Sequence, residues 1–184
     1  DALVEGNRIE RTGHGGIVVD PEFFWLEGPF VKNVRIVGNT LVRNGWASLD
    51  SSGFGVSHAA IQVGCHFGRR MFPRTLGSAQ VNEQIEITGN RIEEPAGYAI
   101  MVMSTRGVEV TDNRINAPFA AGERPAFYDF SQLPLEAGNL GEEQRVALRS
   151  PRDAIFVFGS TEVTQRGNTV EQAPGFLLKP NPTP

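Results

Sequence analysis

The chain contains little cysteine or lysine and no long apolar run. Cys65 is the one cysteine among 184 residues, so an intrachain disulfide is excluded and a cysteine metal site is not expected. Lys32 and Lys179 are the only lysines, and the formal net charge is −4. Because phosphate binding needs a basic surface, this balance argues against nucleic acid or an anionic membrane as a partner. No apolar run reaches transmembrane length, and no signal peptide is recognisable.

What the chain does contain is a short motif that returns five times. Each copy is an alternating apolar run, a Gly or Asp step, an asparagine, and another apolar residue two places on. The asparagines are Asn7, Asn39, Asn90, Asn113 and Asn168. Period-two alternation predicts strands with one buried face, and the asparagine is expected to make the bend because it tolerates a left-handed backbone. A strand–bend–strand unit at such intervals is typical of repeat architectures.

The repeats predict an all-β chain folded as a parallel β-helix of about five coils. Asn90 and Asn113 are separated by 23 residues, about one coil, and the longer intervals elsewhere predict loop insertions that leave the coil. Residues 1–178 are expected to form a single domain, followed by a Pro-rich tail at 179–184. Because the sequence begins inside a coil, we expect it to be the C-terminal part of a longer chain; a chain trimmed at a true domain edge is the alternative.

The strands expected in each coil can be placed along the sequence. They cover 2–5, 8–11 and 16–19; 34–37, 40–42 and 59–63; 85–88, 91–93 and 99–103; 108–111, 114–116 and 154–158; and 162–164, 169–171 and 176–178. In the third coil, Ile87, Ile92, Ile100 and Val102 are predicted to be buried. The five asparagines are predicted to stack as a hydrogen-bonded ladder, in preference to a ligand site, because each amide both donates and accepts.

The segment 20–30 is the strongest functional candidate in the sequence. It places the acids Asp20, Glu22 and Glu27 among Phe23, Phe24 and Trp25. Aromatic faces stack on sugar rings, and a pair of carboxyl groups can cleave a glycosidic bond. We therefore predict Glu27 as proton donor, Asp20 as base or sugar-hydroxyl ligand, and Trp25 with Phe24 as substrate contacts. The alternative, equally weighted, is that these aromatics only cover the flank of the coil.

Other polar residues are weaker candidates. His14, His58, His66 and Arg69 are retained as substrate contacts, although surface or packing roles are commoner for such residues. No histidine pair has the spacing of a helical zinc motif, and no Asp-rich cluster suits calcium. The glycine-rich stretches do not open a helix, so no metal and no cofactor are predicted.

Three stretches carry a resemblance to known proteins. The repeats resemble the right-handed parallel β-helix domains of the pectin-lyase-like group. The segment 16–20, the Trp25-Leu26-Glu27-Gly28-Pro29 turn and the strand at 31–39 are similar to the α-1,3-galactosidase family of β-helix glycoside hydrolases. The likeness covers roughly residues 2–115. The resemblance implies that Asp20 and Glu27 lie near an active groove.

The resemblance implies a glycoside hydrolase, or the C-terminal part of one, acting on a galactoside-like glycan. A non-catalytic carbohydrate-binding or structural β-helix module is the alternative, and a polysaccharide lyase is a weaker one. The expected partner is a polysaccharide or oligosaccharide, with no nucleic acid or membrane. The resemblance also implies a secreted protein, extracellular or periplasmic.

Overall fold

The computed structural model describes residues 1–19, 30–46, 59–64, 82–118, 120, 154–158 and 160–171, and in these residues the chain forms strands and no helix. The strands are β1 (Ala2–Glu5), β2 (Arg8–Glu10), β3 (Ile17–Val19), β4 (Lys32–Val37), β5 (Thr40–Val42), β6 (Ala59–Val63), β7 (Asn82–Thr88), β8 (Arg91–Glu93), β9 (Tyr98–Met103), β10 (Thr105–Thr111), β11 (Arg114–Asn116), β12 (Ile155–Phe158), β13 (Thr161–Arg166) and β14 (Thr169–Glu171). The described residues contain no helix that is long and apolar enough to cross a membrane.

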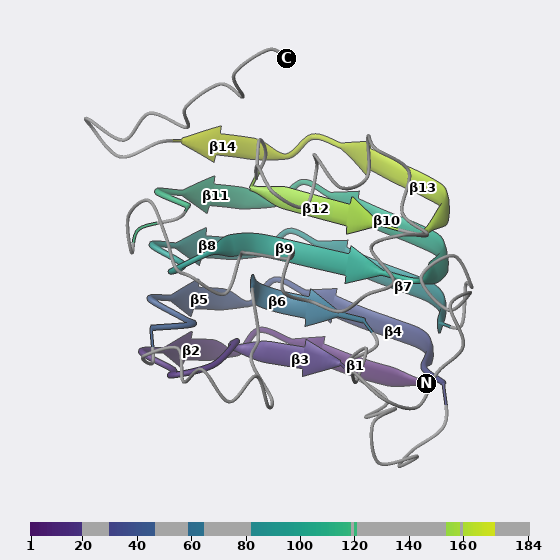
Figure 1. The fold of residues 1–184 in the computed structure, drawn as a ribbon, viewed down its shortest axis with the longest axis horizontal. Helices are drawn as coiled ribbons and strands as arrows, with labels where there is room; N and C mark the ends of the chain where they lie inside the picture. The colour runs from purple at the N-terminus through teal and green to yellow at the C-terminus, as the bar shows by residue number, and fades with distance from the viewer. Residues whose placement is uncertain are drawn as a thin grey trace, which may run out of the picture.

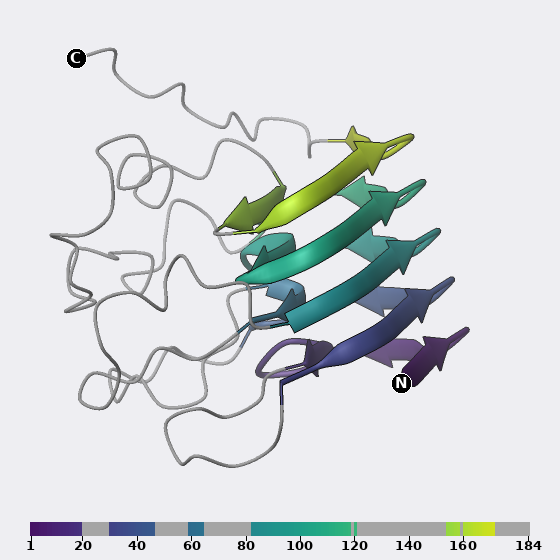
Figure 2. The same ribbon diagram turned by 90° about the vertical axis from the view of Figure 1, so that its right-hand side faces the viewer.

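The described strands form three parallel sheets. Sheet 1 has the order β1-β4-β7-β10-β13, sheet 2 has β2-β5-β8-β11-β14, and sheet 3 has β3-β6-β9-β12. Successive strands along the chain pass from sheet 1 to sheet 2 to sheet 3, and we call each such pass a level. Figure 1 shows the levels stacked from the purple β1 to the yellow β14, and Figure 2 shows the strands of sheet 1 side by side. The prediction of an all-β chain with parallel strands is confirmed.

The bend between sheets 1 and 2 depends on the residue before each asparagine. Gly6, Gly38, Gly89, Asp112 and Gly167 have φ between 55° and 66°, in the left-handed region. Glycine adopts this region without steric cost, and aspartate is one of the side chains that tolerate it. The expectation that the asparagine itself makes the bend is therefore wrong. Its backbone is not left-handed, and its contribution comes from the side chain.

The five repeated asparagines form one hydrogen-bonded column from level to level. At each of the four steps, the backbone N–H and the side-chain Nδ2 of one asparagine donate to the Oδ1 of the next, at 2.9–3.0 Å. From the second asparagine on, Nδ2 also donates to a backbone carbonyl one level earlier, at 2.7–2.9 Å. Asn39, Asn90 and Asn113 are fully buried, and the column satisfies their amides. The predicted ladder is confirmed.

The core consists of apolar columns that run through the levels. Register places Val4, Ile36, Ile87 and Val110 in one such column on neighbouring strands of sheet 1. The predicted core residues Ile87, Ile92, Ile100 and Val102 are each 0% exposed, which confirms that prediction. Apolar side chains on one face of each strand thus meet in the interior, and the opposite face of sheet 1 is left for polar side chains.

Ion pairs cross the outer face of sheet 1. Lys32 and Arg106 each lie 3.1 Å from Glu83, on the strands at either side of it. The hydrogen bond from Lys32, helped by the charges of both cations, holds the pKa of Glu83 below its ordinary value. Opposite charges facing each other on neighbouring strands favour this register.

Candidate functional site

Of the residues predicted to contact or transform a substrate, one is described by the structure. The other seven lie outside the described residues: Asp20, Phe24, Trp25, Glu27, His58, His66 and Arg69. The same is true of the strand expected at 176–178. His14 follows β2 with an exposed side chain, and its carbonyl accepts hydrogen bonds from Thr12 Oγ1 (2.6 Å) and from the N–H of Gly45 (2.8 Å). The proposed catalytic pair therefore stays a prediction.

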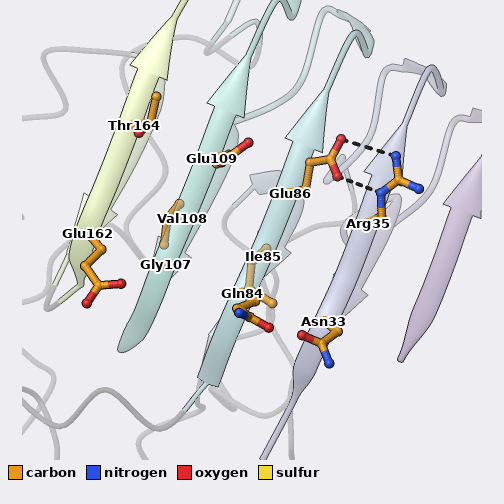
Figure 3. A pocket seen from close by; sticks show the side chains of 10 residues that line it. All are labelled: Asn33, Arg35, Gln84, Ile85, Glu86, Gly107, Val108, Glu109, Glu162 and Thr164. Atoms are coloured by element: carbon orange, nitrogen blue, oxygen red, sulfur yellow. Dashed lines mark hydrogen bonds and ion pairs between the residues drawn. The ribbon is translucent and has the colours of Figure 1, made fainter.

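A shallow groove of about 470 Å³ crosses the outer face of sheet 1 over four adjacent strands, β4, β7, β10 and β13. Its lining comprises Asn33, Arg35, Gln84, Ile85, Glu86, Gly107, Val108, Glu109, Glu162 and Thr164. Figure 3 shows the polar members of this set extending from the strands on one face. The alternating pattern that buries the apolar residues places these polar groups outside.

One column of the groove has a left-handed backbone. Asn33, Gln84, Gly107 and Glu162 occupy equivalent positions on the four strands, and their φ values are 52°, 55°, 73° and 54°. Three of the four positions carry a side chain in this conformation, so the backbone does not require glycine there. Gly107 leaves a gap in this column of side chains, between Gln84 and Glu162.

The adjacent column supplies most of the charge. Arg35 Nε lies 2.6 Å from Glu86 Oε2, and Arg35 Nη2 lies 3.5 Å from Glu86 Oε1. The hydrogen bond and the charge of Glu86 raise the pKa of Arg35, which stays protonated. Glu109 is in register with Glu86 on the next strand, so their Cα atoms are about 4.8 Å apart, the usual spacing between strands.

The groove is acidic. Within the described residues, Glu109 and Glu162 form no ion pair or hydrogen bond through their carboxylates. One arginine against three glutamates in the lining leaves a formal charge of −2. Carboxylates accept hydrogen bonds from hydroxyls and exchange protons, and the side-chain amides of Asn33 and Gln84 both donate and accept. The groove is thus suited to a hydroxyl-rich ligand without negative charge.

A metal ion has no evident place in the described part of the chain. No group of three or more His, Cys, Asp or Glu side chains there has an arrangement that could hold one. Sequence reasoning missed the groove because its residues come from four repeats. The available signal was the set of polar residues at outward positions of the alternating strands, such as Glu86 and Glu109.

Searches against protein-family models, curated proteins and solved structures found no match to this chain.

Proposed function

We propose that the chain is a right-handed parallel β-helix of about five coils with long loop insertions. Each level would be one coil, and the repeated turn would be the corner between its first two strands. The cyclic order of the three sheets and the parallel pairing throughout the described strands support this proposal. The segments that the sequence predicts as insertions lie largely outside the described residues.

On this scaffold we propose a carbohydrate-active protein, a glycoside hydrolase or its C-terminal part, acting on a galactoside-like glycan outside the cytoplasm. The observation that carries the proposal is the groove on sheet 1, with neighbouring carboxylates and amides on one rigid face. The segment containing Asp20 and Glu27 connects β3 to β4, and β4 contributes Asn33 and Arg35 to the groove. The resemblance to α-1,3-galactosidases supports the same substrate class.

The alternative is a non-catalytic carbohydrate-binding or structural module, which would use the groove without the acid pair. A polysaccharide lyase fits less well, since its uronate substrate is an anion and the groove has a formal charge of −2. Placing an anionic substrate beside these carboxylates would bring like charges together and lower the affinity.

Catalysis by the proposed pair is tested with turnover measurements on aryl galactosides and α-1,3-linked galacto-oligosaccharides. Asp20→Asn and Glu27→Gln should each lower kcat by about two orders of magnitude, because each removes proton transfer in the transition state. Glu22→Gln, in the same segment, is the matched control and should leave kcat within about twofold. Normal turnover in both folded variants would remove the pair from the catalytic machinery and favour the binding module.

Use of the groove is tested by filling its gap. Gly107→Gln should weaken oligosaccharide binding, measured by calorimetry, at least tenfold. The fold should be retained, because a Cβ at Gly107 lies no closer than 3.6 Å to Gln84, and Gln84 itself has a side chain at the equivalent position. Gly89→Asp is the control: it places a side chain at a similar φ, outside the groove, where a Cβ has no neighbour within 4 Å. Equal binding by both variants would place the ligand elsewhere.

A further inference from the structure

Trp46 is an exposed aromatic residue held by contacts from three levels. Its indole Nε1–H donates to the carbonyl of Glu94 at 3.0 Å, one level later. Its backbone N–H donates to the carbonyl of Thr12 at 3.2 Å, one level earlier. The N–H of the preceding Gly45 is shared between the carbonyls of Thr12 and His14, at 3.1 and 2.8 Å. Despite these restraints, Trp46 is 39% exposed.

Charged groups surround the indole. The guanidinium carbon of Arg43 lies over the ring, 5.1 Å from its centroid, and Arg43 Nε is 3.7 Å from a carboxylate oxygen of Glu94. Cation–π contact and the ion pair fix the ring on one side. Arg43 and Glu94 cancel in formal charge, so this pair adds no net charge beside the ring, in contrast to the acidic groove on sheet 1.

Such a ring loses little conformational freedom on binding, because it is already ordered in the free protein. Other large apolar side chains are also exposed, but Trp46 combines exposure with a satisfied polar atom and a fixed orientation. An indole offers a flat apolar face, and the neighbouring guanidinium and carboxylate offer hydrogen-bond donors and acceptors at its rim.

We infer that Trp46 is a stacking platform for a neutral sugar ring, with Arg43 and Glu94 contacting its hydroxyls. The apolar C–H face of a pyranose would cover the exposed part of the indole, and the balanced charge would not attract a phosphate or a charged peptide. Of the residues predicted from sequence as substrate contacts, His14 is the one that the structure describes, and its carbonyl accepts the N–H of Gly45. The inference rests on the proposed function, because it assumes that the protein binds a glycan. The Trp46 site shares no residue with the groove on sheet 1, and Trp46 follows β5 of sheet 2.

The test uses a Trp25→Phe background, in which Trp46 is the only remaining tryptophan of the two. Galactotetraose, maltotetraose and cellotetraose are titrated while the fluorescence of Trp46 and its indole N–H resonance are followed. At least one of these neutral sugars should shift both signals. Trp46→Ala should lower the affinity measured by calorimetry at least tenfold, and Trp46→Phe should lower it less because a ring remains. Val170→Ala, which shortens an apolar side chain that is 45% exposed on β14, is the control and should bind normally.

The outcomes separate this inference from the proposed function. Unchanged affinity in Trp46→Ala would overturn the platform, whether or not the galacto-oligosaccharides are hydrolysed. Trp46-dependent binding, with no hydrolysis by the parent chain that retains Trp25, would support the platform and count against the hydrolase. Failure of all three sugars to bind would also overturn the platform, and hydrolysis of aryl galactosides would then still support the enzyme.

Discussion

Replacing Asn90 by leucine is expected to lower the free energy of unfolding by about 3–5 kcal/mol, because it leaves several buried polar groups without a partner. Asn90 Oδ1 accepts the backbone N–H and the Nδ2 of Asn39, at 2.9 and 3.0 Å. Asn90 Nδ2 donates to the carbonyl of Ile36 and to Asn113 Oδ1, both at 2.9 Å. Water cannot replace these bonds, since all three asparagines are fully buried.

The measurement is urea unfolding followed by circular dichroism, together with the melting temperature. For a chain of this size we expect a fall of roughly 10 °C in the melting temperature. Asn7→Leu is the matched control at the exposed end of the same column, where water can replace the lost bonds, and it should cost about 1 kcal/mol or less. Equal losses in the free energy of unfolding of the two variants would show that burial of the asparagine does not determine how much it contributes to stability.

Ile87→Asn is expected to destabilise the chain by a similar amount, about 3–5 kcal/mol. The substitution removes a buried aliphatic side chain, which contributes roughly 1.5–3 kcal/mol. It also introduces an amide among apolar neighbours, at a further cost of about 1–3 kcal/mol. Ile87 is 0% exposed and stands between Ile36 and Val110 in the register of sheet 1, so neither neighbouring level can supply a hydrogen-bond partner from its side chain.

The same unfolding experiment tests Ile87→Asn against Ile87→Val. The valine variant should cost only about 0.5–1.5 kcal/mol, because it deletes a single methylene from the column. Glu86→Gln, one residue earlier but on the outer face, measures the effect of a change on the opposite side of the strand. A melting temperature of Ile87→Asn within 2 °C of the parent chain would contradict the assigned register.

Much of the fold could be predicted from the sequence because the residue pattern of each repeat predicts its own local structure. The period-two alternation around Asn90 predicted the strands at 85–88 and 91–93, and the structure has strands at Asn82–Thr88 and Arg91–Glu93. Four strands of sheet 1, β4, β7, β10 and β13, begin earlier than predicted, because Gln84 and its equivalents are not apolar and interrupt the alternation without ending the pairing. The position of the bend was misjudged by one residue, since both glycine and asparagine favour turns and the sequence does not separate their roles.

The candidate groove could not be predicted in the same way. Its residues come from four repeats, and Arg35 and Glu86 are 51 positions apart in the chain although they form an ion pair. The loop residues chosen from sequence, such as Asp20 and Trp25, share a composition suited to glycans, which is a property of residue types and not of their arrangement.

The sequence by itself determined which residues alternate between interior and surface, where each turn lies to within one residue, and that five equivalent asparagines recur. These are local properties: they follow from side-chain polarity, from a two-residue period and from the few residues that tolerate a left-handed backbone. Only the tertiary structure decided which repeats are neighbours and in what register. That choice brought Glu86 beside Glu109, left a gap at Gly107 between Gln84 and Glu162, and fixed Trp46 against the carbonyl of Glu94. The physical reason is that such contacts depend on the stacking of levels, whose spacing is set by backbone hydrogen bonds between strands that are far apart in the chain.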